Sequence, residues 1–209
     1  MAARDVFLIR HAESTWNAAG RWQGMADIEL SERGHQQAQS LATSWDAPHV
    51  THIFSSTLDR ARATASPLAA HLGIDPVEDA DLCELDVGSW QGRTRQEIHS
   101  EDPDSLRAFF RGAQGWTGGE TYEEHAARAD RFVQRLLHLP DEASVAVFTH
   151  GGTLRAILLA MLDLNPSERW RFSGSMHVHR THLQAGEFGY RLLAYNAPVG
   201  SHDPLQETL

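Results

Sequence analysis

The chain contains no lysine, and all 18 of its basic residues are arginine. This absence excludes mechanisms that depend on a lysine amine: Schiff-base formation, a pyridoxal-phosphate lysine and the lysine of a P-loop. Arginine instead supplies a planar fork of N–H donors that matches carboxylate and phosphate oxygens in pairs. The absence of lysine is explained better by a codon-biased genome than by a functional need for arginine. The lysine-dependent mechanisms are excluded under both explanations.

Cysteine and long apolar runs are equally scarce. Cys83 is the single cysteine, so no internal disulfide can form, which favours a cytoplasmic protein. No apolar run approaches the roughly 20 residues that a membrane span needs, and a strand-like segment begins too close to residue 1 to leave room for a signal peptide. We therefore expect no membrane partner.

Positive charge is in deficit, because 28 acidic residues against 18 basic ones give a net charge of −10. This balance argues against nucleic acid as a partner. It does not argue against a small phosphate ester, since charges further apart than about 8 Å are screened at physiological ionic strength. The expected partner is a small phosphorylated metabolite, and the sequence is compatible with a homodimer.

Strand-like and helix-like segments alternate along the chain, which is typical of parallel α/β architecture. We predict a single α/β domain over residues 1–197, with a mostly parallel central sheet and helices on both faces. A glycine-rich, aromatic stretch at about 87–119 predicts a helical insertion over the active site. Its aromatic residues, together with Trp16 and Tyr122, are expected to divide evenly between core and substrate-facing rim. Residues 198–209 have little to bury and are expected to form a mobile tail.

Two of the predicted strands end in a histidine. Arg10-His11 follows the apolar run at residues 6–9, and His150 follows the run at residues 145–148. Ligands of open α/β sheets bind beyond the carboxyl ends of the strands. Helix-opening sequence follows each histidine, so backbone N–H groups and two imidazoles are expected to converge on one anion. The pattern predicts a phosphate site with a histidine nucleophile.

Five sequence blocks extend this pattern in a fixed order. They are Leu8-Ile9-Arg10-His11-Ala12-Glu13-Ser14-Thr15-Trp16-Asn17, Leu30-Ser31-x-x-Gly34, Ser55-Ser56-x-Leu58-x-Arg60-Ala61-x-x-Thr64-Ala65, Glu84-x-x-x-Gly88-x-Trp90-x-Gly92 and Thr149-His150-Gly151-Gly152. Together they resemble the histidine phosphatase superfamily, the cofactor-dependent phosphoglycerate mutase-like proteins, from about residue 6 to residue 160.

The resemblance implies a phosphoric monoester hydrolase that works through a phosphohistidine, with no metal and no cofactor of its own. His11 is then the nucleophile, Glu84 the proton donor, and His150, once protonated, a further positive charge. The implied phosphate-binding residues are Arg10, Asn17, Gln23, Gly24, Arg60 and Gly151. General acid–base catalysis supplies only about 10²–10⁴-fold, so the covalent step and the arginines must contribute the remainder. Glu84 must carry a proton near neutral pH, which requires burial or a bound phosphate to raise its pKa.

One position departs from the resemblance. The family usually has glycine after the histidine, and this chain has Ala12. If the backbone there needs a positive φ, alanine would be strained. A strained Ala12 would put the geometry of the site in question.

Two other functions stay open at this point. A phosphoglycerate mutase-type transferase would need an arginine after the acid and an adjacent arginine pair in a longer insertion. Here Leu85 follows Glu84, no Arg-Arg pair exists, and Gly88-x-Trp90-x-Gly92 resembles the phosphatase subgroup. A catalytically inactive phosphate-binding module is the second alternative, and the intact His11, Glu84 and His150 argue against it.

Some singled-out residues also have structural interpretations. Arg60 could pair with Asp59 or Glu84 rather than bind phosphate. His177, His179 and His182 resemble a metal motif, but on a strand over residues 177–183 the third would point to the opposite face from the first two. We interpret them as a solvated strand face.

Overall fold

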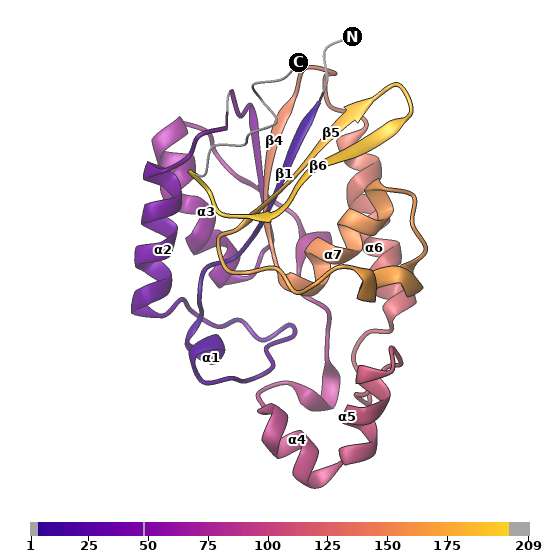
Figure 1. The fold of residues 1–209 in the computed structure, drawn as a ribbon. Helices are drawn as coiled ribbons and strands as arrows, with labels where there is room; N and C mark the ends of the chain where they lie inside the picture. The colour runs from indigo at the N-terminus through magenta and orange to yellow at the C-terminus, as the bar shows by residue number, and fades with distance from the viewer. Residues whose placement is uncertain (1–3, 48, 201–209) are drawn as a thin grey trace.

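A six-stranded sheet with the strand order β3-β2-β4-β1-β5-β6 forms the centre of the computed structural model, which describes residues 4–47 and 49–200 (Figure 1). Neighbouring strands among β3, β2, β4 and β1 are parallel, whereas β5 is antiparallel to both β1 and β6. This confirms the predicted α/β class and its mostly parallel sheet. The strands are β1 (Asp5–Arg10), β2 (His52–Ser55), β3 (Val77–Glu78), β4 (Ser144–Thr149), β5 (Arg180–Gly186) and β6 (Gly189–Ala197).

The parallel pairing of β1 with β4 brings the two histidines together. Arg10 lies opposite Thr149 in the register, so His11 and His150 leave the sheet side by side. The His11 backbone N–H donates to the Thr149 carbonyl at 2.8 Å and extends the pairing by one residue. All six residues of β4 are buried, as expected of a parallel strand covered on both faces.

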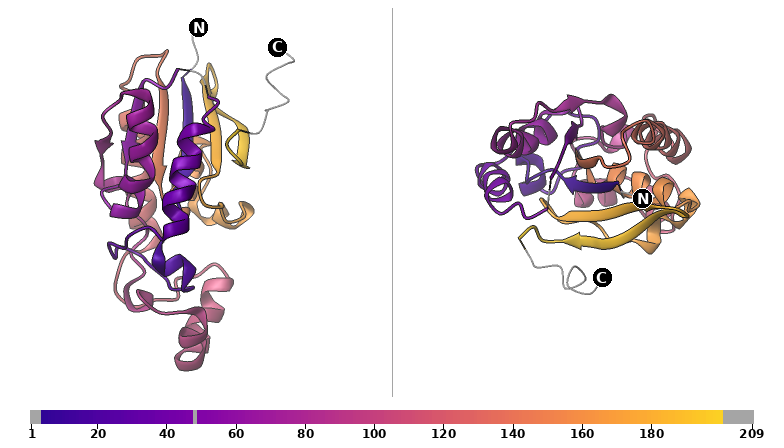
Figure 2. Two further views of the ribbon diagram at one scale, coloured as in Figure 1. Left: turned by 90° about the vertical axis from the view of Figure 1, so that its left-hand side faces the viewer. Right: turned by 90° about the horizontal axis from the view of Figure 1, so that it is seen from above.

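Helices cover both faces of the sheet, as Figure 2 shows from the side. Phe7 and Ile9 of β1 pack toward α2 (Glu32–Thr43) and α3 (Asp59–Leu72), and the alternate residues Val6 and Leu8 pack toward α6 (Tyr122–Leu136) and α7 (Gly151–Met161). This alternation follows from the two-residue period of a strand. It fixes the positions of α3 and α7, which both contribute to the site.

The helix ends follow local signals in the sequence. Ser31 caps α2 by accepting from the Gly34 N–H, and Thr121 forms a capping box with Glu124 at the start of α6. Gly73 ends α3 in the left-handed conformation, with φ +67°. These three signals were all readable from the sequence.

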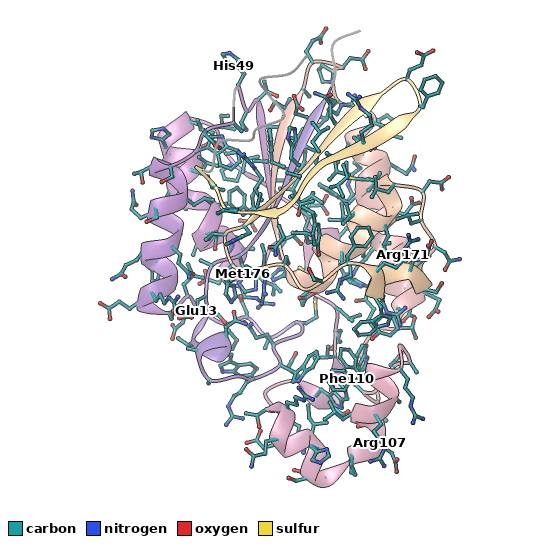
Figure 3. All side chains as sticks on the ribbon, in the orientation of Figure 1. Glu13, His49, Arg107, Phe110, Arg171 and Met176 are labelled. Atoms are coloured by element: carbon teal, nitrogen blue, oxygen red, sulfur yellow. The ribbon has the colours of Figure 1, made fainter. Side chains whose placement is uncertain are left out.

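The predicted insertion forms a small lobe beyond the carboxyl edge of the sheet (Figures 1 and 2). It has its own apolar cluster, in which Trp90 and Trp116 are buried, while Phe110 on its surface is 54% exposed (Figure 3). The short elements of the chain are α1 (Thr15–Ala18), η1 (Ala80–Leu82), η2 (Gly88–Trp90), α4 (Arg95–Glu101), α5 (Pro103–Phe110) and η3 (Pro166–Arg171).

The structure corrects the expected strand at residues 177–183 and describes only part of the expected tail at residues 198–209. The strand expected from His177 begins only at Arg180, because the chain turns at Val178, where φ is +53°. The interpretation of His177 and His179 as a solvated strand face is therefore wrong. Of the expected tail, residues 201–209 lie outside the described residues, while Val199 packs against the cluster under α2 and α3. Within residues 4–47 and 49–200, no helix is both long enough and apolar enough to cross a membrane.

Gly34 offers a stability test of the loop that follows His11. A Cβ at this position would clash with the backbone carbonyl of Glu13. Replacing glycine by alanine inside a helix normally stabilises a protein by about 1 kcal/mol. Overpacking, however, costs about 1–3 kcal/mol. Because the clash here is with backbone, we expect Gly34→Ala to lower the free energy of unfolding. Urea denaturation measures this, with the exposed Gln36→Ala of the same helix as control. A Gly34→Ala protein more stable than wild type would contradict the close approach.

Candidate active site

A cavity of about 730 Å³ opens beyond the carboxyl ends of β1 and β4. Seven of the predicted site residues line it: Arg10, His11, Asn17, Gln23, Gly24, Arg60 and Glu84. They come from three parts of the chain, residues 10–24, Arg60 and Glu84, and only the fold brings these parts together. The other two, His150 and Gly151, do not belong to the cavity wall.

His11 is held in one tautomer. Its Nδ1 lies 2.6 Å from the Ala12 carbonyl oxygen, which can only accept, so the proton is on Nδ1 and Nε2 carries a lone pair. Burial, reinforced by the positive charges of Arg10 and Arg60, holds the pKa of His11 well below its usual value. The ring is therefore neutral at pH 7, and Nε2 is the ring atom with a lone pair available.

The backbone around His11 is fixed from three sides. Besides the bond to Thr149, the Ala12 N–H donates to Thr64 Oγ1 at 2.9 Å, and His177 Nδ1 donates to the His11 carbonyl at 2.9 Å. Ala12 is not among the non-glycine residues with positive φ in the described chain, so alanine is unstrained there. The concern about this departure is therefore removed.

His150 lies beside His11, with 5.1 Å between the ring centroids. Arg60 Nε donates to His150 Nδ1 at 3.1 Å, so the ring proton sits on Nε2, which lies 2.8 Å from Ser56 Oγ. Burial and the charge of Arg60 keep the pKa of His150 well below its usual value. His150 is neutral here, and both ring nitrogens already have partners, so the positive charge expected of a protonated His150 stays a prediction.

Arg10 and Arg60 place two guanidinium groups in the wall. Arg60 is fully buried, and its terminal nitrogens donate to the carbonyls of Gly24 and Ala26 at 2.8 and 2.6 Å. Burial lowers the pKa of Arg60 to about 10, so it stays charged at neutral pH. Arg10 donates one bond to the Ser175 carbonyl, and its buried Nε has no partner in the described part of the chain. Arg60 pairs with neither Asp59 nor Glu84.

The amide side chains of Asn17 and Gln23 are oriented by Ser14. Their carbonyl oxygens both lie within hydrogen-bond distance of Ser14 Oγ, at 3.0 and 2.7 Å. Each NH₂ group is then left free to donate elsewhere. Gly24 has φ +52°, and a Cβ there would come within 2.9 Å of Val87 Cγ2, so only glycine fits this turn.

Glu84 occupies the N-terminus of α7. Its carboxylate accepts from the backbone N–H groups of Gly152 and Thr153 at 3.1 and 3.2 Å, and from that of Leu85 at 2.9 Å. A Cβ on Gly152 would lie 2.5 Å from Glu84 Oε1, so glycine is needed for this approach. The sequence predicted that the N–H groups at the start of α7 would donate to a bound phosphate. In the structure the N–H groups of Gly152 and Thr153 donate to the Glu84 carboxylate instead.

These donors also decide the charge of Glu84. Burial alone would raise the pKa of this carboxyl, but nearby His125, the N–H groups of Leu85 and Gly152, and Arg60 outweigh it and hold the pKa below its usual value. Of the two causes that could raise this pKa, burial is therefore outweighed, and a bound phosphate is the one that stays a prediction. Glu84 is a carboxylate at neutral pH unless a bound anion changes its surroundings.

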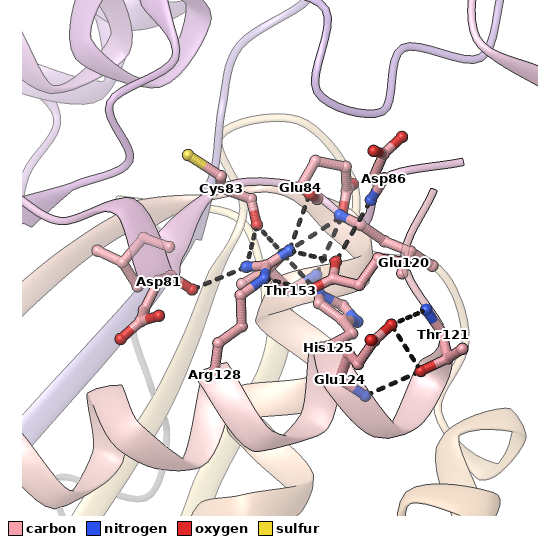
Figure 4. A network of polar contacts seen from close by, with 12 residues as sticks. Asp81, Cys83, Glu84, Asp86, Glu120, Thr121, Glu124, His125, Arg128 and Thr153 are labelled. Carbon is pink, nitrogen blue, oxygen red and sulfur yellow. Dashed lines mark hydrogen bonds and ion pairs between the residues drawn. The ribbon is translucent and has the colours of Figure 1, made fainter. Parts of the chain in front are cut away.

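An arginine that the sequence analysis missed holds the segment carrying Glu84 (Figure 4). Arg128 of α6 donates to the carbonyls of Asp81, Cys83 and Glu84 at 2.6 to 2.9 Å. It also forms a bidentate pair with the Glu120 carboxylate at 2.7 and 2.9 Å. No motif marks Arg128, and only the fold brings α6 against this segment.

Two other residues were missed for different reasons. His177 was singled out but placed on a strand; its ring lies 5.5 Å from that of His11, and burial lowers its pKa to about 4. Arg155 lines the cavity one helical turn beyond Gly151 and Gly152, so the helical period could have identified it. In residues 4–47 and 49–200 no three side chains are grouped as metal ligands.

Comparison with known proteins agrees with this geometry. Residues 6–198 match the family described as "Histidine phosphatase superfamily (branch 1)". "Phosphoserine phosphatase 1" of Hydrogenobacter thermophilus is 32% identical over 169 residues, 80% of each chain. "Phosphoglycerate mutase-like protein 4" of Arabidopsis thaliana is 33% identical over 158 residues, 73% of this chain and 69% of that protein.

A solved structure is similar over nearly its whole length. It is a mycobacterial glucosyl-3-phosphoglycerate phosphatase in complex with VO3, with a TM-score of 0.84 and 32% identity over 93% of this chain and 99% of that one. The family match at residues 6–198 spans both histidines, the acid and all of the phosphate-binding candidates. The chain therefore belongs to branch 1 of the histidine phosphatase superfamily.

Proposed function

We propose that the protein is a phosphatase that hydrolyses small phosphate monoesters through a phosphohistidine on His11. The observation that carries this proposal is the state of His11. Its proton is fixed on Nδ1 by the Ala12 carbonyl, and it shares a cavity with two guanidinium groups and a carboxyl group. A neutral imidazole facing a positively charged pocket is suited to attack a phosphate group.

The arginines supply the charge that phosphoryl transfer needs. Arg10 and Arg60 can each donate charge-assisted hydrogen bonds to phosphate oxygens, and the unpartnered Arg10 Nε is a buried donor that such an oxygen would satisfy. The NH₂ groups of Asn17 and Gln23 add neutral donors. A phosphate dianion in the cavity would raise the pKa of His150, and protonation of its Nδ1 would replace the bond that Arg60 Nε now donates to that atom.

The reaction proceeds in two steps. His11 Nε2 attacks phosphorus, the P–O bond to the leaving group breaks, and the leaving oxygen takes a proton from Glu84. Water then attacks the phosphohistidine, Glu84 takes a proton from that water, and the N–P bond breaks to release inorganic phosphate. Each step restores the protonation state that the next one needs, and no other reactant is required.

The proton on Glu84 must enter with the substrate. The carboxylate is ionised before substrate binds, because its pKa is held low. A phosphate ester has a second pKa of about 6, so its monoanion brings one proton to the site. The bound phosphate raises the pKa of Glu84 and allows the proton to move there.

Hydrolysis is favoured over mutase-type transfer by the wall of the insertion. Within the described residues, the insertion lines the cavity only with Val87, Phe109 and Trp116, which are apolar. The mutases that the chain resembles carry an adjacent arginine pair in a longer insertion, and this chain has no such pair. A cytoplasmic location and a homodimer stay predictions from the sequence.

The proposal is tested by trapping the phosphoenzyme. With a substrate labelled in the phosphoryl group, we expect labelled protein after a base quench and loss of the label in acid, as for an N–P bond. Inorganic phosphate should be released from a panel of monoesters, and EDTA should leave the rate unchanged. Label that survives acid but not base would contradict the phosphohistidine, and isomerisation of phosphoglycerate without phosphate release would favour the mutase.

A further inference from the structure

The cavity is larger than a phosphoryl group and a short leaving group require. Its volume of about 730 Å³ lies in the range of sites that enclose drug-sized ligands, about 300–1,000 Å³. Beyond the phosphate-binding residues it continues along α7 and η3, where Leu159, Leu164 and Trp170 contribute apolar wall. The part of a substrate that leaves as an alcohol therefore has room for a ring or a longer chain.

Arg155 stands in this outer part without a counter-charge. Its buried Nε has no hydrogen-bond partner, and no carboxylate within residues 4–47 and 49–200 forms an ion pair with it. Its guanidinium carbon lies 5.9 Å from the ring centre of Trp170. Arg10 and Tyr122 line the same cavity, and the charge of Arg155 acts to lower the pKa of each of them.

A second arginine adds to this charge. Arg169 of η3 lies 3.6 Å above the Tyr122 ring and 5.5 Å from that of Trp170. It donates to the Gly112 and Pro166 carbonyls, but its buried Nε lacks a partner in the described chain. Arg155 and Arg169 therefore both approach Trp170.

Arginines without an ion pair are unexpected in this cavity wall because the protein has more carboxylates than arginines, with a net charge of −10. Arg21, in the same wall, does pair with a carboxylate, that of Glu97. The acidic residues of this wall are Glu84, which α7 holds, and the exposed Asp130 and Asp163, which form no ion pair with Arg155 or Arg169 in the described residues. Arg155 and Arg169 are partly exposed, but the Nε of each is a buried donor without a partner in the described chain, which is costly. An anionic group bound between the two side chains would satisfy these donors.

We propose that Arg155, assisted by Arg169, binds a second anionic group carried by the leaving group of the substrate. The inference rests on the proposed phosphatase function and narrows its substrate class. The preferred substrates are then phosphate monoesters whose alcohol also bears a carboxylate or a second phosphate-like group, and whose apolar part lies against Trp170. Arg10 and Arg60 bind the reacting phosphoryl group, and Arg155 binds the other end.

Matched aryl esters test the charge without changing the shape. The probes are 4-carboxyphenyl and 4-(carboxymethyl)phenyl phosphate, each paired with its carboxamide. We expect the better carboxylate of the two to exceed its amide in kcat/KM by about tenfold or more, the effect of one charge-assisted hydrogen bond. Arg155→Gln should bring that ratio to about one, whereas Arg111→Gln, an exposed arginine outside the cavity, should keep it. Equal turnover within both pairs, or a ratio unchanged in Arg155→Gln, would overturn the proposal.

Binding measurements separate this inference from the phosphatase itself. Calorimetry of the same esters with His11→Ala, with and without Arg155→Gln, needs no turnover. If Arg155→Gln abolishes the tighter binding of the carboxylate ester over its amide, the subsite is supported even if no ester is hydrolysed. If the carboxylate and the amide bind with equal affinity before that substitution, the subsite is contradicted even if every ester is hydrolysed. A further ester, 4-phosphonophenyl phosphate, indicates whether the subsite prefers a carboxylate or a phosphate-like dianion.

Discussion

In the His11→Ala enzyme, turnover of phosphate monoesters is expected to fall by about 10⁵-fold or more, because no other group at this position can accept the phosphoryl group. Removal of a covalent nucleophile from a preorganised site has effects of this order. Arg10 and Arg60 remain in the variant, so inorganic phosphate should bind with similar affinity. Steady-state kinetics measures the first effect, and calorimetry with phosphate measures the second.

The control for this prediction is His35→Ala, which removes an exposed histidine from α2. It should leave kcat and KM unchanged, and both variants should keep the unfolding temperature of the wild type within a few degrees. If His11→Ala retained wild-type turnover, the phosphohistidine route would be wrong. If wild type hydrolysed no ester while phosphate still bound, the protein would be a phosphate-binding module.

The positions of the two histidines were predictable because each one directly follows a strand-like apolar run. Arg10-His11 and His150 each follow a continuous apolar run, and parallel strands present their carboxyl ends at one edge. Local signals mark where helices begin and end, such as the Ser31 cap of α2 and the glycine at position 73 after α3. Strand ends and helix ends of this kind depend on a few neighbouring residues, so a short stretch of sequence is enough to predict them.

The protonation states at the site were not predictable, because they depend on contacts between distant segments. His150 is neutral because it is buried and because Arg60, 90 residues away, lies against it and donates to its Nδ1. Glu84 is ionised because the first turn of α7 meets it, and burial alone would have had the opposite effect. Only the packing of α3 and α7 on opposite faces of the sheet produces these contacts.

His177 was misplaced for a local reason. Alternating residues at 177–183 favour a strand, but Val178 adopts a positive φ that β-branched residues rarely accept. The His177 side chain bonds to the His11 carbonyl and the Val178 N–H donates to that of Arg10, at 2.9 and 3.0 Å. A tertiary contact with β1 has therefore overridden the local preference.

Glu84→Gln is expected to separate the two steps of the reaction. The amide side chain of this variant keeps an oxygen to accept from the Gly152 N–H but cannot donate an acidic proton. With alkyl phosphates kcat should fall by about 10²–10⁴-fold, the usual contribution of a general acid. With 2,4-dinitrophenyl phosphate, whose leaving group needs no proton, we expect a rapid burst of one equivalent followed by slow turnover, since the phosphohistidine then lacks its base.

Stopped-flow release of dinitrophenol measures the burst directly. Glu32→Gln, an exposed acid in the first turn of α2 outside the cavity, is the matched control and should behave like wild type. If the burst slowed as much as alkyl turnover, Glu84 would act only by holding α7 in place. Its assignment as proton donor would then be wrong.

The pH dependence follows from the same carboxyl group. Glu84 is ionised before substrate binds, so the proton must come from the ester monoanion. The monoanion becomes scarcer above the second pKa of the substrate, which is about 6. Wild-type kcat/KM for alkyl esters should therefore fall about tenfold per pH unit above that value. His11 and His150 have pKa values well below the usual 6.5, so neither adds an acid limb between pH 6 and 7. With dinitrophenyl phosphate, the burst rate of Glu84→Gln should not show this decline, because no proton is transferred. A loss of wild-type activity as the pH falls from 7 to 6 would instead indicate a histidine that titrates there, and the neutral imidazole at position 11 would be wrong.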